Sequence, residues 1–341
     1  MARSHRRKAG GRPRLSIVAI VSLAGLLSAS CSHASPTTAS GANTSNHRGS
    51  STRGKDRPST PVAPTTSAPA TSTTTTLPEP PPAPTLGDWT VTSGTVQRPA
   101  VAATIIPIDA GGTATVSCMR IDPALVRLEL MSGTQQPNTA QPSFGTVPLA
   151  DRASLVAAFN AGFKMSQSVG GWFSHGRMAV PLRGGAASLV LRNDGTADVG
   201  VWGRDVTMGP TVTAVRQNLL LLIDGGAPTA LVMTPAYELV WGKTLHHQIS
   251  VWRSGVGITK TGMLVYCAGK ALTVPQLAQG LLAAGAVRAM ELDINTQYVD
   301  AYLYRPSPTG PLGTKLAAEM HSGPEHYLTS QARDFVEVLA R

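Results

Sequence analysis

The chain has 341 residues, a formal net charge of +10 and three cysteines, and only 14% of its residues are charged. Charged residues usually make up ~25% of a globular domain, so the composition predicts that part of the chain does not belong to one. Three cysteines exclude a disulfide-rich scaffold. Outside the N-terminus no apolar run reaches the ~20 residues of a membrane span, which excludes a polytopic membrane protein.

The positive charge lies in one part of the sequence. Residues 1–57 hold ten Lys/Arg and one acid, whereas residues 88–341 hold 19 Lys/Arg and 17 Asp/Glu. A nucleic-acid-binding domain carries its basic surface on the folded part of the chain. We therefore expect no nucleic-acid partner.

The N-terminus has the layout of an export signal. Several Lys and Arg residues up to Arg14 precede an apolar run from Leu15 to Ala29, as in a charged n-region followed by an h-region. The segment ending at Cys31 resembles a bacterial lipoprotein signal, although Ser28 stands where such signals usually carry Leu. We expect residues 1–31 to be the signal, Cys31 to be lipidated, and the protein to be exported to the outer face of the cell membrane. A plain cleaved signal and an uncleaved single-span anchor are the alternatives.

Residues 32–87 are rich in Ser, Thr, Pro and Ala. They hold almost no residue that could fill a core, so ordering them would not be compensated by burial. Proline keeps such a segment extended. We expect a disordered spacer between the signal and a folded domain over residues 88–341.

The sequence of residues 88–341 predicts mostly short strands separated by turn residues. Two hairpins are predicted: residues 188–192 with 197–202 around Asn193-Asp194-Gly195, and residues 256–259 with 263–268 around Lys260-Thr261-Gly262. Further strands are predicted over residues 115–121, 125–131, 155–159, 219–223 and 287–294.

Two helices are predicted. Thr273 and Gln276 form a capping box with Pro275 at the start of the helix, and Gly285 ends it. The strand that precedes this helix and the strand that follows it predict a β-α-β crossover. A second helix is predicted over residues 330–339. The expected fold class is α+β, with a mixed, mostly antiparallel sheet and a few helices.

Cys118 and Cys267 both fall in predicted strands. Two remaining cysteines in an exported domain favour one disulfide. Two buried free thiols are the alternative, because sequence spacing says nothing about the distance between the cysteines.

The strongest chemical candidate is the alternating segment around Glu291, Asp293 and Asn295. In a strand these three side chains point to one face. Two nearby carboxyl groups can separate their pKa values, so that one acts as acid and the other as base. The alternative is a solvated strand face.

Other candidates are weaker. Arg253 beside Gly255 and Gly257 could bind an anion with a guanidinium and backbone N–H groups. Asp224 follows an apolar strand, and Asn160 lies in a tight turn after one. His175, His246 and His247 are possible proton donors, although lone histidines more often have packing or surface roles. No spacing predicts a metal site or a nucleotide-binding loop, and the cofactor is unknown.

Several of these segments together resemble the phosphodiester glycosidase family. The resemblance covers about residues 116–304 and is strongest over residues 157–163 and 253–258, then over 272–278 and 285–293. It implies a glycan or sugar-phosphate substrate, with Asp293 and Glu291 as acid/base or nucleophile. Arg253 would hold the phosphate, and Asn160 and Asp224 would position the substrate.

This chain departs from the family pattern at two places. Ala161 and Lys164 stand in a segment that is usually Asn-Gly-Gly-Phe-Phe, and Ile294-Asn295-Thr296-Gln297 replaces three glycines and a serine. A glycine run allows close approach of the backbone to a ligand, and β-branched Ile294 does not. Three functions therefore stay open: a hydrolase of a glycosidic or sugar-phosphodiester bond in a cell-envelope glycan, a non-catalytic glycan-binding lipoprotein, and a structural envelope protein.

Overall fold

The computed structural model describes residues 82, 88–109, 111–137, 144–234 and 240–341. All of them belong to one unit of the chain, Thr71–Arg341. The predicted signal, Cys31 and all of the predicted spacer except Pro82 lie outside the described residues.

The largest sheet has eight strands, and each pair of neighbours runs antiparallel. In spatial order they are β1 (Thr90–Gly94), β2 (Pro99–Pro107), β3 (Thr115–Ile121), β14 (Leu264–Leu272), β13 (Val251–Thr259), β15 (Ala286–Glu291), β11 (Leu221–Asp224) and β12 (Ala227–Pro228).

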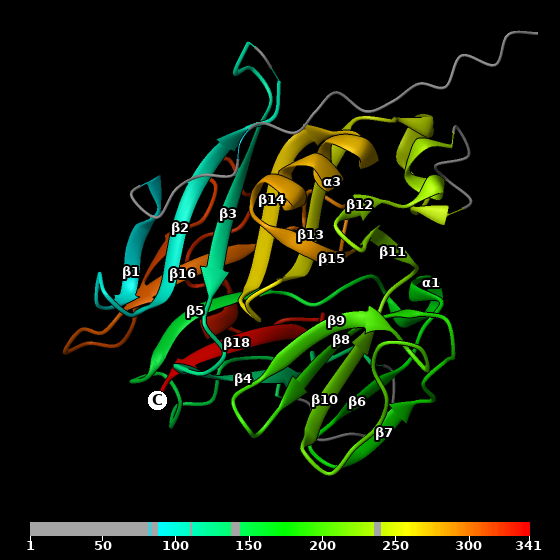
Figure 1. The fold of residues 1–341 in the computed structure, drawn as a ribbon. Coiled ribbons are helices and arrows are strands. Elements are labelled where there is room, and N and C mark those ends of the chain that lie inside the picture. The colour runs from blue at the N-terminus through cyan, green and yellow to red at the C-terminus, as the bar shows by residue number, and fades with distance from the viewer. Residues whose placement is uncertain (1–81, 83–87, 110, 138–143, 235–239) are drawn as a thin grey trace, which may run out of the picture. The chain divides into compact units, whose positions relative to one another are not determined.

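Two five-stranded antiparallel sheets complete the fold (Figure 1). One has the order β17 (Leu312–Lys315), β16 (Ala301–Arg305), β5 (Leu155–Asn160), β18 (Phe335–Ala340) and β4 (Val126–Met131). The other has the order β7 (Arg177–Val180), β6 (Trp172–Ser174), β10 (Val212–Gln217), β8 (Ala187–Arg192) and β9 (Ala197–Val201).

The predicted α+β class is wrong, because the protein is predominantly β. Its described residues form 18 strands and only two α-helices, the four-residue α1 (Met165–Ser168) and α3 (Val274–Ala283). Short 3-10 turns occur at Ala230–Met233, Leu245–His247 and His326–Leu328.

The helix α3 begins as the sequence predicts. Thr273 Oγ1 accepts from the backbone N–H of Gln276, and the side chain of Gln276 accepts from the backbone N–H of Thr273. The capping box is therefore confirmed. The helix covers one face of the large sheet (Figure 1). It joins β14 to β15, which run in the same direction because both pair antiparallel with β13 between them.

The second predicted helix, residues 330–339, is wrong. Residues 335–340 form β18, which pairs with β5 on one side and with β4 on the other. Every residue from Phe335 to Leu339 is buried. A central strand that is buried on both faces has no period-2 alternation, so its apolar run resembles that of a helix.

Both predicted hairpins are confirmed, with β8 pairing β9 and β13 pairing β14. The main core fills the space between the three sheets, and a second core lies under α3. Cys118 and Cys267 face each other on β3 and β14 and form a disulfide, with an Sγ–Sγ distance of 2.06 Å. Within the described ranges, no helix is both long and apolar enough to cross a membrane.

Candidate active site

Three of the segments singled out in the sequence meet at one hydrogen-bond network. Asn160, at the end of β5, donates through Nδ2 to Ser254 Oγ at 3.1 Å. Ser254 Oγ in turn accepts from the backbone N–H of Asp293 at 3.2 Å. Tyr266 donates to Asn160 Oδ1 at 2.7 Å. The side chain of Asn160 is thus fixed from both ends, and it is joined to Asp293 through a single hydroxyl.

Arg333, just before β18, closes this network on its other side. Its Nη2 donates to Asp293 Oδ2 at 3.0 Å and to the carbonyl of Gly162 at 3.0 Å. Its guanidinium also lies over the ring of Tyr298, 4.5 Å from the centroid. Arg333 therefore holds the turn after β5 against the segment that follows β15.

A second buried pair supports the turn after β5. Arg216 Nε donates to Asp334 Oδ2 at 2.6 Å, and Arg216 Nη2 donates to the carbonyl of Phe163. Gly162 has φ +156°, and a Cβ at this position would lie 3.0 Å from the Arg216 guanidinium. Any other residue here would strain the backbone and displace the Arg216 guanidinium, which favours glycine.

Asp293 is almost completely buried, with 2% exposure. Its Oδ1 accepts from the backbone N–H groups of Ile294 at 2.8 Å and Asn295 at 2.9 Å. Burial raises the pKa of Asp293 to about 6, while Arg333 and the two N–H groups oppose that rise. A carboxyl group with such a pKa can exchange a proton near neutral pH.

Glu291 has a different environment although it lies only two residues away. Its Oε1 accepts from Arg253 Nη1 at 2.6 Å, and both side chains are at most 1% exposed. Arg253 also donates to the carbonyls of Leu272 and Ile249. Burial raises the pKa of Glu291 to about 7, and Arg253 opposes the rise. The pair is enclosed in the sheet.

The structure gives packing roles to Gly255 and Gly257. A Cβ at Gly255 would lie 2.9 Å from Leu281 Cδ1 of α3, and one at Gly257 would lie 2.8 Å from the Cβ of Ala286. Both glycines are central residues of β13, paired with β14 and β15. Their close packing leaves no space for an anion beside them.

Asp224 lies away from the network. Asp224 is the last residue of β11. The backbone N–H of Gly226, two residues later, donates to the carbonyl of Val287 near the start of β15, whereas Glu291 is the last residue of β15. The carboxylate of Asp224 pairs with Arg204 at 2.7 Å on the surface. Of the three histidines considered, His246 and His247 are exposed, and His175 lines a separate cavity.

A small cavity of about 70 Å³ opens beside the network. Asn160, Arg333 and Tyr298 line it together with His326 and Asp334. Its volume is far below the ~300–1,000 Å³ of ligand pockets, so it has room only for water or one small group. His326 Nε2 lies 3.6 Å from Asp300 Oδ2, and burial lowers the pKa of this histidine.

A larger cavity of about 310 Å³ is lined by the segment that follows Asp293. Ile294, Asn295 and Thr296 form one wall, and Trp252 is also part of the lining. Two exposed lysines, Lys243 and Lys270, line it as well, and its described lining contains no acidic residue. Its volume and charge suit a small anionic ligand.

The structure thus brings together Asn160, Asp293 and Asn295. Asp224 lies on the surface with Arg204, and Glu291 forms an ion pair with Arg253, next to Asp293, whose charge adds to the rise in the pKa of Glu291. Sequence reasoning missed Ser254, Arg333, Asp334, Asp300 and His326. Arg333 and Asp334 stand in the segment that was assigned to a helix, and the β-branched Val336 and Val338 were the available signal for a strand. Among the described residues, no group of three or more His, Cys, Asp and Glu side chains could hold a metal ion.

Comparisons with known proteins give only distant likenesses. No family model matches the chain, and no curated protein matches it. The catalytic domain of zebrafish N-acetylglucosamine-1-phosphodiester alpha-N-acetylglucosaminidase, auto-inhibited by its pro-peptide, is 16% identical, with a TM-score of 0.48 over 74% of this chain and 87% of that one. A hypothetical protein from Synechocystis is 14% identical, with a TM-score of 0.46 over 71% of this chain and 62% of that one. These values are too low to transfer an activity.

Proposed function

We propose that this protein is an exported, lipid-anchored hydrolase that cleaves a glycosidic or sugar-phosphodiester bond in a cell-envelope glycan. The observation that carries the proposal is the network that joins Asn160, which lines the small cavity, through Ser254 to Asp293, whose neighbours Ile294 and Asn295 line the larger cavity. These residues come from three of the separate segments on which the family resemblance rests.

In this proposal the anionic substrate occupies the cavity of about 310 Å³. Lys243 and Lys270 attract its phosphate, and the indole of Trp252 supplies an apolar wall for the sugar. Asn295 lines the same cavity and offers its side-chain amide to the substrate, while its backbone N–H donates to Asp293.

Asp293 acts as the general base that activates water. Its pKa of about 6 leaves it ionised at neutral pH. A phosphate monoester, with a second pKa of ~6, is a stable leaving group that needs little protonation. One carboxylate is therefore sufficient, and Glu291 takes a structural role as the partner of Arg253.

A second candidate is a glycan-binding protein without catalysis. The observation in its favour is the burial of Asp293, whose two carboxylate oxygens already accept three hydrogen bonds. Such a protein would use the same cavity and would bind the same class of ligand.

Purified protein incubated with methyl diesters of hexose 1-phosphates distinguishes the two candidates. Release of reducing sugar together with methyl phosphate is the result expected of the hydrolase. In water enriched in oxygen-18, the label should enter the sugar hydroxyl if the C1–O bond breaks. Saturable binding of the same diesters without turnover would support the second candidate and contradict the first.

Export and anchoring rest on the sequence alone. Replacing Cys31 with Ala should release the protein from membranes, since acyl chains at ~0.8 kcal/mol per buried CH₂ would be its anchor. If the Cys31→Ala protein has a cleaved signal and still stays with the membrane, lipidation is not the anchor.

A further inference from the structure

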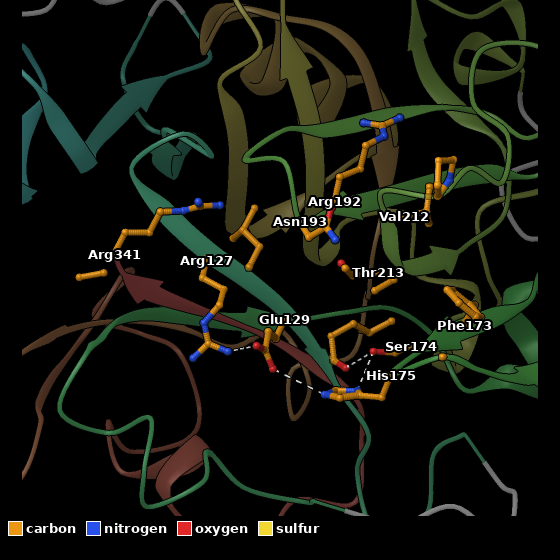
Figure 2. Close-up of a pocket in the computed structure, with 16 residues that line it drawn as sticks. Arg127, Glu129, Phe173, Ser174, His175, Arg192, Asn193, Val212, Thr213 and Arg341 are labelled. Atoms are coloured by element: carbon orange, nitrogen blue, oxygen red, sulfur yellow. Dashed lines mark hydrogen bonds and ion pairs between the residues drawn. The ribbon is translucent and has the colours of Figure 1, made fainter. Parts of the chain in front are cut away.

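Another cavity shares no lining residue with the two cavities near Asp293 and has a different character. Its volume is about 560 Å³, and it is bounded by β4 on one side and by β6, β8 and β10 on the other. Figure 2 shows Arg127 and Arg341 on one side, with Asn193 and Thr213 across from them. Apolar side chains of β4 and β10 also line it.

One wall of this cavity is the open edge of a sheet. β4 is the last strand in its sheet and pairs only with β18. The backbone N–H of Arg341 donates to the carbonyl of Leu125. Because backbone groups alternate along a strand, the odd-numbered residues of β4 face β18, and Val126, Leu128 and Leu130 face the open edge.

Side chains occupy the two ends of this edge but leave its middle open. The carbonyl of Val126 accepts from Arg341 Nε at 2.8 Å. The carbonyl of Leu130 accepts from Ser174 Oγ at 2.9 Å. Leu128 lies between them in the cavity lining. Its N–H and C=O groups are therefore available to an added strand.

Three arginines and one acidic residue, Glu129, stand in the described lining of this cavity. Arg127 is paired with Glu129 and Asp151. Arg192 and Arg341 also line the cavity, and within the described part of the chain neither forms an ion pair with a carboxylate. Two guanidinium groups thus remain for an acidic ligand. His175 does not add charge at neutral pH, since burial lowers its pKa.

We propose that this cavity binds a short extended peptide that carries a carboxylate. The peptide pairs with the N–H and C=O of Leu128 as an additional strand, and its carboxylate binds Arg192 and Arg341. At ~3.3 Å per residue, a segment of about four residues spans the distance from the carbonyl of Val126 to that of Leu130. The apolar side chains of the lining contact the side chains of the peptide.

The N-terminal part of this chain is too basic to be the peptide that occupies this cavity. Residues 1–57 hold ten Lys/Arg and one acid, so they would be repelled by the same arginines that attract an acidic peptide. A separate acidic peptide is the ligand that the cavity fits.

The test uses the purified protein and an acetylated peptide, Ac-Thr-Val-Thr-Val-Asp, in isothermal titration calorimetry. We expect saturable binding that weakens with added salt. A peptide with N-methyl groups on its central amides should bind at least about tenfold more weakly, because it cannot pair with the strand. A peptide that ends in Lys-amide instead of Asp should bind at least about tenfold more weakly as well.

Variants locate the site. Arg192→Ala should weaken binding about fivefold or more, whereas Arg177→Ala, an exposed arginine on β7 outside the cavity lining, should not change it. Leu128→Pro removes the N–H that points to the open edge and no hydrogen bond to β18, so it should abolish binding, while Leu128→Ala keeps that N–H and should retain binding.

Three outcomes would overturn the proposal. The first is absence of binding, and the second is equal affinity for the N-methylated peptide. The third is binding of inorganic phosphate as tight as that of the peptide, which would indicate an anion site without strand pairing. The peptide and phosphate measurements use unmodified protein, so they decide the matter even if Leu128→Pro does not fold.

Discussion

Two buried guanidinium–carboxylate pairs have carboxylates only two residues apart, at Glu291 and Asp293, and they differ in what surrounds them. Arg253 and Glu291 are 2.6 Å apart, with side chains that are 1% and 0% exposed. Arg333 and Asp293 are 3.0 Å apart, and the side chain of Arg333 is 12% exposed. The first pair is enclosed by β-strands, whereas the second lies beside a cavity.

This difference shows that residue type and burial do not by themselves identify a functional carboxylate. Glu291 and Asp293 both have raised pKa values because both are buried. Only Asp293 is joined to groups that line a cavity, namely Arg333 on one side and Asn295 on the other. We therefore expect the enclosed pair to matter for stability and the pair beside the cavity to matter for chemistry.

The largest effect on stability is expected at the enclosed pair. Arg253→Met leaves the Glu291 carboxyl buried without its partner and should cost about 3–5 kcal/mol. Arg333→Met should cost less, because Asp293 keeps two backbone donors and water can enter from the cavity. Urea denaturation of both variants measures the difference. An equal loss in the two variants would contradict the comparison.

Glu337 extends the comparison to a carboxyl group that has no hydrogen-bond partner among the described residues. It is fully buried on β18, and neither carboxyl oxygen has a hydrogen-bond partner. Burial, with a smaller effect of Asp151, raises its pKa to about 8. In the unfolded chain the pKa returns to ~4.3.

Stability should therefore fall as the pH rises. Between the two pKa values the folded protein keeps a proton that the unfolded chain has lost, so the stabilisation is complete below about pH 4 and is lost towards pH 8. From pH 5 to pH 8 we expect a loss of roughly 3 kcal/mol from this group. Glu337→Gln should remove most of that loss in urea denaturation, and an unchanged pH dependence would refute the assignment.

Ser254 tests whether the network beside the cavity acts as a unit. Ser254→Ala leaves Asn160 Nδ2 and the N–H of Asp293 without their shared acceptor and should cost about 1–2 kcal/mol. In the Arg333→Met background the same change should cost at least about 0.5 kcal/mol less, because the network is already broken. Strict additivity in the double-mutant cycle would show that the two sides are independent.

The smallest effect is expected at Tyr298. Its ring lies under the Arg333 guanidinium at 4.5 Å. Tyr298→Leu should cost about 0.5–1 kcal/mol, the usual value for a cation–π contact of this kind. Tyr298→Phe keeps the aromatic face and should be close to wild type, and a larger loss for Phe than for Leu would argue against the contact.

Local patterns predicted the local structure well. The turn signals placed two hairpins, and the capping box placed the start of α3, because these features depend on residues within a few positions of each other. The segment that contains β18 was misassigned because its burial is set by β4 and β5, which are distant in the sequence.

The same reason explains which parts of the candidate site were missed. Asp293 and Asn160 stood out as polar residues at strand ends. Arg333 forms an ion pair with Asp293, 40 residues away in the sequence, and Arg216 forms one with Asp334, 118 residues away. Such long-range pairs leave no local sequence pattern. Glu291 and Asp293 were predicted to share a strand face, but β15 ends at Glu291, so the alternation does not extend to Asp293.

The most direct test of the proposed function compares Asp293→Asn with Glu291→Gln on a hexose 1-phosphate diester that the unmodified protein cleaves. Asp293→Asn should keep the fold and lower turnover roughly 100-fold or more, the usual contribution of a general base. Turnover of the unmodified protein should rise as the pH passes through about 6, the pKa of Asp293. Glu291→Gln should retain turnover to within about threefold per folded molecule, since Glu291 takes no part in proton transfer. Full turnover in Asp293→Asn, or an equal loss in both variants, would contradict the account.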